Sequence, residues 1–263
     1  MFEYLATLPR ASWVLDLGSS AGSFDANLTP ARLVRVDLET KPTNRGGEFI
    51  QADAGRMPLR DHCLDVVVAN HCFEHFVKLG PALDELGRTI KPTGTIFISV
   101  PDAATLTDRL YRWLGRGGGH VNPFTYVGEL PELVTAATGL PLTATVLLHS
   151  GLSFLNRRNM TSVQKKLLLL GGGHESVLRV VTLALRSLDR HLGMRLSVYG
   201  WAYYFGAYQP TDLAARTNVC IGCGCGHSAR ELRAAGLVKR AWCLPCYACP
   251  HCGSRNFFTR DQS

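Results

Sequence analysis

Short apolar runs rich in β-branched residues recur through the first half of the chain, separated by polar and glycine-containing stretches. Because each run is brief and almost wholly apolar, it predicts a strand buried on both faces of a parallel sheet. The runs are Trp13–Leu17, Leu33–Asp37, Phe49–Ala52, Leu64–Ala69 and Thr95–Val100.

A helical pattern separates the fourth run from the fifth. Leu79, Leu83, Leu86 and Ile90 follow one another at intervals of three and four residues, so they share one face of a helix that ends before KPTG. Strand, helix and strand together form a βαβ unit, whose crossover makes the strands parallel. We therefore expect an α/β fold with a doubly wound, Rossmann-like, mostly parallel sheet.

The second half continues this sheet and then changes character. Leu142–His149 and Leu196–Phe205 read as two further strands, with a helix from about Ser176 to Leu192 between them. Apolar patterning stops near residues 209–218, where we place a domain boundary. We expect one domain over residues 1–210, with a basic helical insertion at about 151–195, and a small module over residues 218–260.

Composition agrees with two folding units in one chain. With 263 residues, 46% of them hydrophobic, the chain can bury the core of a domain of about 200 residues and still carry an appendage. It lacks the run of about 18 apolar residues that a membrane helix needs, and MFEYLATLPR does not have the basic-then-apolar pattern of a secretion signal. We therefore expect a cytoplasmic protein.

The segment WVLDLGSSAGSF carries the first candidate chemistry. It is an apolar strand that enters a turn containing Gly18 and Gly22 and then a short helix, an arrangement that brings backbone N–H groups close to a ligand. Asp37 follows Gly18 by 19 positions, at the end of the next strand, where it can accept two ribose hydroxyls. The combination indicates a nucleoside-containing ligand, whereas the glycine turn alone is equally consistent with ordinary α/β packing.

Four segments in order, DLGSSAG, RVDLE, FIQADAGRMPLRDHCLDVVVANHCFEHF and LGRTIKPTGTIFISVP, resemble class I S-adenosylmethionine-dependent methyltransferases, over about residues 10–150. The resemblance is to the compact branch that includes quinone-biosynthesis and sugar or lipid methyltransferases. It implies S-adenosylmethionine as cofactor and a set of cofactor-binding residues. These are Asp16, Gly18 and Gly22 around the methionine part, Ser20 in the same turn, Asp37 on the ribose, Asp53 and Ala54 at the adenine, and Asn70 beside the amino group. Ser20 departs from the family, which often has glycine there.

Methyl transfer requires the two reactants to be aligned and water to be excluded, and a hydroxyl acceptor also benefits from a general base. The candidates for that base are His71, His75 and His120, although each is as readily explained as a packing residue. Glu74 reads as an acid at a helix start. A dehydrogenase would use the same fold, but DLGSSAG is not the G-x-G-x-x-G pattern of dinucleotide binding.

Seven of the nine cysteines lie between Cys220 and Cys252. CIGCG and CPHCG are two C-x-x-C-G turns, which resemble a zinc ribbon and predict one zinc ion. The predicted ligands are Cys220, Cys223, Cys249 and Cys252. A second site from Cys225, Cys243 and Cys246 with His227 or His251 is the alternative.

Charge is segregated along the chain. The net charge of +7 divides into −3 over residues 1–150, +6 over residues 151–195 and +4 over residues 218–263. Arg179, Arg186 and Arg190 share one helical face, which we expect to be solvated and to lie opposite Val177, Val181, Leu185 and Leu188. An anionic acceptor or a membrane surface is the alternative partner for this face.

We therefore expect a methyltransferase that acts on a small acceptor, namely a sugar, a lipid or a phosphate-bearing intermediate. Two rivals remain. One is an RNA methyltransferase that uses the zinc ribbon to bind nucleic acid, although the sequence lacks an N/D-P-P-Y/F motif. The other is a non-enzymatic scaffold of the same fold, with the zinc module bound to a partner protein.

Overall fold

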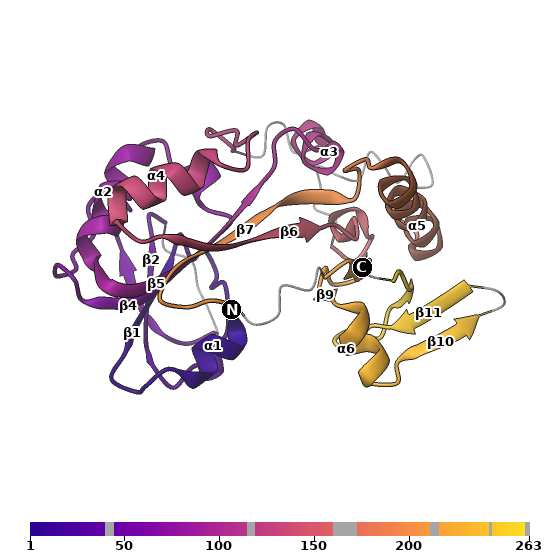
Figure 1. Ribbon diagram of the computed structural model, residues 1–263, viewed down its shortest axis with the longest axis horizontal. Coiled ribbons are helices and arrows are strands. Elements are labelled where there is room, and N and C mark those ends of the chain that lie inside the picture. Colours follow the sequence, from indigo (N-terminus) through magenta and orange to yellow (C-terminus); the bar gives the residue numbers. More distant parts are fainter. Residues whose placement is uncertain (40–44, 115–118, 160–172, 211–215, 242–243, 261–263) are drawn as a thin grey trace. The chain divides into compact units, whose positions relative to one another are not determined.

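The computed structural model describes residues 1–39, 45–114, 119–159, 173–210, 216–241 and 244–260 (Figure 1). The chain divides into two compact units, each assembled from three segments. Unit 1 comprises residues 1–102, 120–146 and 201–212, and unit 2 comprises residues 103–119, 147–200 and 213–263. The boundary predicted near residues 209–218 falls partly on residues 211–215, which lie outside the described residues.

A seven-stranded sheet has the strand order β3-β2-β1-β4-β5-β7-β6. The pairs β1–β2, β1–β4, β2–β3 and β4–β5 are parallel, which confirms the predicted doubly wound, mostly parallel arrangement. The strands are β1 (Trp13–Leu17), β2 (Arg32–Asp37), β3 (Glu48–Gln51), β4 (Leu64–Asn70), β5 (Ile90–Pro101), β6 (Leu142–His149) and β7 (Val198–Gly206).

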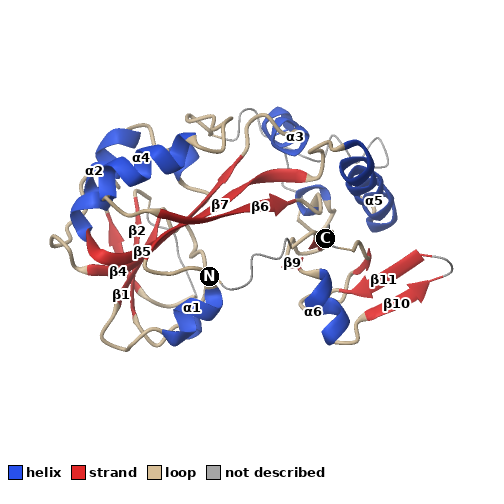
Figure 2. Cartoon of the chain, in the orientation of Figure 1, coloured by secondary structure: helices blue, strands red, loops and turns tan. Residues whose placement is uncertain are grey.

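Helices cover both faces of the sheet in unit 1 (Figure 2). These are α1 (Phe2–Thr7), α2 (Leu79–Thr89) and α4 (Glu129–Thr138), with the 3₁₀ turns η1 (Ala26–Leu28) and η2 (Phe73–His75). Neighbouring residues of β1 serve opposite faces: Leu15 packs in a core with Leu86 of α2, and Val14 packs in another with Leu5 of α1. This division follows from the alternation of side chains along a strand.

The short helix expected after the glycine turn of β1 does not form. Residues 19–25 are turns and bends, and only η1 follows. Asp25 caps η1 by accepting a hydrogen bond from the backbone of Asn27 at 2.9 Å. Thr29 is extended because it precedes Pro30, and a residue before proline disfavours the helical conformation. The turn therefore ends after 3₁₀ geometry and does not extend into a helix.

Unit 2 consists of short elements around small apolar clusters. It contains α3 (Leu106–Leu114), η3 (Ser153–Leu155), α5 (Glu175–Leu192) and α6 (Ala229–Ala234), the hairpin of β8 (Asn218–Val219) and β9 (Gly226–His227), and the three-stranded sheet of β10 (Val238–Ala241), β11 (Leu244–Ala248) and β12 (Arg255–Phe257). The helix predicted from about residue 176 to 192 is confirmed as α5. No helix among the described residues is long and apolar enough to cross a membrane.

Candidate cofactor pocket and cysteine cluster

A pocket of about 580 Å³ opens at the carboxyl ends of β1, β2 and β4. This edge is where open α/β sheets bind their ligands, and the volume suits a nucleoside-sized molecule. The lining residues that the sequence predicted are Gly18, Ser20, Asp37, Asp53, Ala54, His71 and His75. Lining residues that it did not predict include Leu38, Cys72 and Phe76.

Gly18 and Ser20 shape the turn that borders the pocket. Gly18 has φ +62°, and a Cβ atom there would lie 2.4 Å from the Cβ of Cys72, so glycine is required. Ser20 also has a positive φ of +47°, in the region that favours glycine. Its backbone N–H donates to Asp37 Oδ2 at 2.7 Å, which joins the turn to the end of β2.

The two aspartates of the pocket are held by backbone donors. Asp37 Oδ1 accepts a hydrogen bond from the Glu39 N–H at 3.0 Å, so both carboxylate oxygens of Asp37 are oriented by the loops beside them. Asp53 Oδ1 accepts from the Gly55 N–H at 2.9 Å. Both side chains line the pocket. These residues fit the cofactor-binding set that the family resemblance implies.

Asp16, Gly22 and Asn70 are not among the residues that line the pocket. Asp16 is fully buried, where it pairs with Arg35 and accepts a hydrogen bond from the Ser23 N–H at 2.9 Å. Burial raises the pKa of Asp16 despite these partners. Asn70 accepts from the Ser99 hydroxyl at 2.6 Å. The structure therefore gives Asp16 a supporting position under the turn instead of a place on the pocket wall.

Arg35 is a site-supporting residue that the sequence analysis missed. It is fully buried, and its guanidinium donates to Asp16 and, at 2.6 Å, to the Phe24 carbonyl beneath the turn. The sequence does contain a sign of this role, because an arginine interrupts the apolar run LVRVD in the middle of β2. A charge at a buried strand position implies a buried partner.

Glu74 brings the three candidate histidines together. It is 1% exposed, and its Oε1 lies 3.6 Å from Nδ1 of His71 and 3.9 Å from Nε2 of His75. The ring of His75 meets that of His120 edge-on, with centroids 4.9 Å apart. Glu74, His75 and His120 present ligand atoms within 4.8 Å of one another. Such an arrangement can relay a proton or hold a cation beside the pocket.

A loop segment fixes this cluster from the other side. The backbone N–H groups of Val121 and Asn122 donate to the Glu74 carbonyl at 2.8 and 3.0 Å. The side-chain amide of Asn122 donates to the carbonyls of Phe73 and Phe76. His120 is thereby held against η2 although it is distant in sequence. His71 and His75 line the pocket, and His120 is not among its lining residues.

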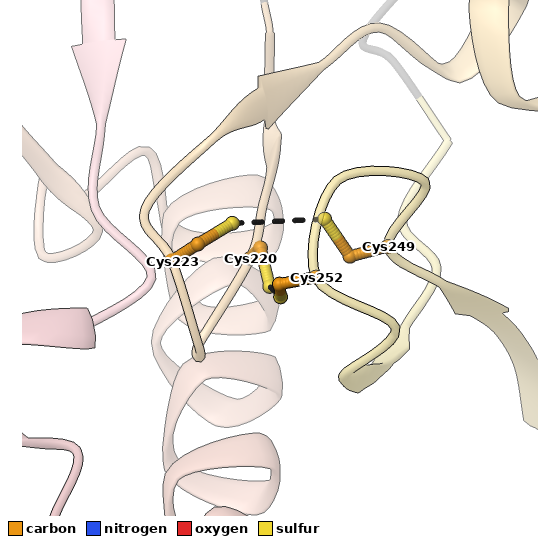
Figure 3. Close-up of side chains that lie close together, drawn as sticks. All are labelled: Cys220, Cys223, Cys249 and Cys252. Carbon is orange, nitrogen blue, oxygen red and sulfur yellow. Dashed lines mark hydrogen bonds between the residues drawn. The ribbon is translucent and has the colours of Figure 1, made fainter. Parts of the chain in front are cut away.

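The four predicted metal ligands lie together in unit 2 (Figure 3). Sγ of Cys220 is 3.6 Å from that of Cys252, and Sγ of Cys223 is 3.7 Å from that of Cys249. A zinc ion about 2.3 Å from each of four sulfurs separates them by about 3.8 Å in tetrahedral geometry. The sulfur positions therefore fit one tetrahedral ion, and they are too far apart for disulfide bonds, whose length is about 2.05 Å.

The trailing glycines account for the fold of both turns. Gly224 and Gly253 have φ values of +78° and +74°, which residues with a Cβ rarely adopt. Each donates its N–H back to the first cysteine carbonyl of its turn, Gly224 to Cys220 and Gly253 to Cys249. The Gly222 N–H also points at the Cys220 sulfur, at 3.2 Å. The positive φ of Gly224 and Gly253 permits the tight bend of each C-x-x-C-G turn.

The thiols differ in how readily they lose a proton. Burial raises the pKa of Cys220 and Cys249, and it raises that of Cys223 to about 12. Partial burial acts in the same direction on Cys252, but hydrogen bonds involving Ser254 outweigh it and lower its pKa to about 6. An ion bound here would therefore displace protons from three of the four thiols.

A second cysteine site is not assembled among the described residues. Cys225 and Cys246 are free thiols outside the four-cysteine cluster, and Cys243 lies outside the described residues. His227 approaches Cys249, with its Nε2 3.6 Å from Sγ, but it belongs to no further ligand group in the described part of the chain.

The predicted arginine face of α5 is wrong at its centre. Arg186 is buried with Leu178 and Thr182, and its Nη2 donates to the Val219 carbonyl at 3.0 Å. Val177, Val181 and Leu188, expected inside, are exposed. The prediction assumed that the apolar side of the helix faces inward. Arg186 instead points inward because it donates to the Val219 carbonyl, a contact that the spacing of apolar residues does not reveal.

Comparison with known proteins supports the interpretation of unit 1. Residues 15–98 match the family model described as a methyltransferase domain. The chain is 28% identical over 130 residues to a malonyl-[acyl-carrier protein] O-methyltransferase of Methylococcus capsulatus, covering 44% of this chain and 47% of that protein. It is 24% identical over 177 residues to the biotin biosynthesis bifunctional protein BioHC of Cellvibrio japonicus, covering 64% of this chain and 35% of that protein.

The chain thus spans about half the length, or less, of these curated relatives. A solved structure of similar fold is a SAM-dependent methyltransferase from Archaeoglobus fulgidus, with 20% identity and a TM-score of 0.52 over 77% of this chain and 88% of that one. Residues 15–98 therefore resemble a methyltransferase domain, and the strand order and the solved structure agree on the fold.

Proposed function

We propose that the protein transfers a methyl group from S-adenosylmethionine to a small-molecule acceptor at the pocket of unit 1. The observation that carries this proposal is the joint placement of the glycine turn and Asp37 on one pocket wall. In the proposal, Asp37 accepts the ribose hydroxyls, Asp53 and Ala54 border the adenine, and Gly18 lets the backbone approach the methionine part. When bound, the cofactor supplies an electrophilic methyl group on its sulfonium.

Two further residues of the predicted cofactor-binding set, Asp16 and Asn70, do not line the pocket. Asp16 supports the turn through Arg35 and Ser23 and does not touch the ligand. Asn70 remains the predicted neighbour of the cofactor's amino group, at the end of β4. The rest of the chain's contribution is alignment and exclusion of water, because an in-line displacement depends chiefly on those two factors.

For a hydroxyl acceptor, the cluster around Glu74 supplies a general base. We assign the base to His71 or His75, since both line the pocket and both lie near the buried Glu74 carboxylate. A carboxylate behind an imidazole fixes its tautomer and stabilises the cation that forms when it takes a proton. His120 contributes through its contact with His75.

The acceptor class is a separate part of the proposal. A relative is named for methylation of an acyl-carrier-bound malonyl group, so anionic carboxylates join sugars, lipids and phosphate-bearing intermediates as acceptors to be tested. An RNA methyltransferase and a non-enzymatic scaffold are the rivals. Formation of S-adenosylhomocysteine with a small acceptor would exclude the non-enzymatic scaffold, and its absence with RNA would exclude the RNA methyltransferase.

Calorimetry on cofactor binding tests the assignment of Asp37. Asp37→Ala should weaken S-adenosylmethionine binding by about 2 to 4 kcal/mol, because charge-assisted hydrogen bonds are the strong kind. Asp37→Asn keeps an acceptor for Ser20 and should lose affinity with the turn intact. Asp84→Ala, on the exposed side of α2, is the matched control. Equal affinity in Asp37→Ala and the control would refute the site.

We infer further that the four-cysteine cluster holds one zinc ion with a structural role. The sulfur separations and the free state of the thiols support this. Elemental analysis should find about one zinc per chain. Cys249→Ser should abolish it, whereas Cys246→Ser and Cys243→Ser should retain it. Two zinc ions, or the absorbance of an iron–sulfur centre, would contradict the ligand assignment.

A further inference from the structure

Helix α5 presents its apolar side to solvent. On one side of the helix, the buried residues follow one another at intervals of four. They are Leu178, Thr182 and Arg186, and two of the three are polar. The neighbouring side carries five large aliphatic side chains with exposed fractions between 39% and 65%, namely Val177, Val180, Val181, Leu188 and Leu192. Single exposed apolar residues are ordinary, but a continuous row along four turns of a helix marks a binding surface.

Polar anchors hold the helix in this orientation. Arg186 donates to the Val219 carbonyl, and the Asp189 carboxylate accepts from the N–H groups of Leu196 and Ser197 at 2.6 and 2.7 Å. Near the start of the helix, Glu175 pairs with Arg158 at 3.2 Å. Rotation of α5 to bury its aliphatic row would break these interactions and leave the Val219 carbonyl and the N–H groups of Leu196 and Ser197 without these partners.

An apolar pocket of about 260 Å³ continues this surface within unit 2. Leu106 and Leu110 of α3 form one wall, and Val177 and Val181 of α5 form the other. Thr107 also lines it, but its hydroxyl donates to the Val198 carbonyl at 2.8 Å. Apolar cavities of about 150 Å³ hold a benzene ring, so this space has room for a segment of an alkyl chain.

Positive charge lies in the same segment as the apolar surface. Residues 151–195 carry a net charge of +6, and their two acidic residues, Glu175 and Asp189, are engaged in the contacts above. Arg157 and Arg195 are exposed in this segment, and Arg190, also exposed, lies on the side of α5 away from the aliphatic row. On α3, Trp113 is 75% exposed. Exposed aliphatic side chains, a tryptophan and arginines together are the features of a surface that enters the headgroup region of an anionic bilayer.

We propose that unit 2 docks on an anionic phospholipid bilayer through α3 and α5, with an acyl chain entering the pocket between them. The aliphatic row supplies apolar contact, the pocket accepts part of one chain, and the arginines meet the lipid phosphates. This proposal is independent of methyl transfer at unit 1. It extends the function to a place of action, because an enzyme held at a bilayer meets acceptors that partition into it.

Vesicle co-sedimentation of the full chain tests the proposal. Binding is expected to vesicles of phosphatidylcholine mixed with phosphatidylglycerol and to fall steeply as salt rises. The double variant Val177→Asp with Val181→Asp should lose at least about tenfold in affinity. Leu142→Asp, at an equally exposed position of unit 1, should bind like the wild type.

A second set of variants tests the electrostatic part. Arg157→Gln and Arg195→Gln should each reduce binding to anionic vesicles by about fivefold and flatten the salt dependence, whereas Arg190→Gln, on the other side of α5, should change binding less. Cofactor calorimetry and circular dichroism establish that each variant is folded, so failure of docking is distinguishable from failure of the methyltransferase site. Binding that is absent, or that survives the Asp substitutions, would overturn the proposal. So would a wild-type dimer that the same substitutions dissociate, because a second copy would then cover the surface.

Discussion

At the scale of single residues, Gly18 and Ser20 both have a positive φ, but only at Gly18 is there no room for a Cβ atom. Gly18→Ala would place a Cβ 2.4 Å from Cys72 Cβ in a left-handed conformation, and should destabilise unit 1 by about 2 to 4 kcal/mol. Ser20→Gly should change stability by less than about 1 kcal/mol, since relief of strain offsets the added freedom of the unfolded chain. Chemical denaturation of both variants measures this. A Gly18→Ala protein as stable as Ser20→Gly would contradict the packing argument.

Arg186 lacks a carboxylate partner among the described residues, and its Nε has no hydrogen-bond acceptor there. Its Nη2 donates to the carbonyl of Val219, the residue before Cys220. With zinc bound, the four thiolates and the ion together would carry a net charge of −2. Arg186→Met removes a buried charge at similar volume but leaves the Val219 carbonyl without this donor, so the stability of the metal-free protein should change by less than about 2 kcal/mol. Zinc affinity, measured by competition with a chelator, should fall by about tenfold. Arg190→Met, exposed on the same helix, should leave the affinity unchanged.

At the scale of elements, α6 depends on a capping box at its first turn. The Ser228 hydroxyl accepts from the Glu231 N–H at 3.1 Å, and Glu231 Oε2 accepts from the Ser228 N–H at 2.9 Å. Ser228→Ala should cost about 1 kcal/mol and reduce the hydrogen-exchange protection of residues 229–241. Ser187→Ala, on the exposed side of α5, serves as the control. Unchanged protection in Ser228→Ala would show that the cap is dispensable.

The type of each element was predictable where local pattern and burial agree. The runs around Val14 and Val67 are apolar because the strands are covered on both faces, so periodicity alone identified β1 and β4. The orientation of α5 was not predictable in this way. Its inward side is chosen by the Val219 carbonyl and by backbone N–H groups near Ser197, which no count of apolar residues contains.

The site was predictable for similar reasons. Gly18, Asp37 and the four clustered cysteines follow from spacing within short segments, because each motif closes its own local geometry. The association of His120 with Glu74 could not be anticipated, because 45 residues separate them in sequence and backbone bonds from Val121 and Asn122 make the contact. Long-range contacts of this kind depend on how loops pack.

At the scale of the whole molecule, each unit should respond to its own ligand. S-adenosylmethionine at one hundred times its dissociation constant should stabilise unit 1 by about 2.7 kcal/mol. A zinc chelator should lower the unfolding temperature of unit 2, whose apolar clusters are small. Differential scanning calorimetry on the full chain should therefore resolve two transitions with separate ligand dependence. A single transition that moves with both ligands would contradict independent units.

The interleaving of the units also bears on how the chain folds as it leaves the ribosome. β7 lies between β5 and β6 in the sheet, yet residues 147–200, which belong to unit 2, are synthesised before most of it. The nascent chain can form β1 to β5 early, but the apolar surface that Trp201, Tyr203 and Phe205 later cover stays open until β7 emerges. Domains made of one continuous segment can fold as soon as they are complete. The sheet of this chain, in contrast, can close only after about four-fifths of the 263 residues have been synthesised. Until then, the uncovered apolar surface is available for a chaperone to bind.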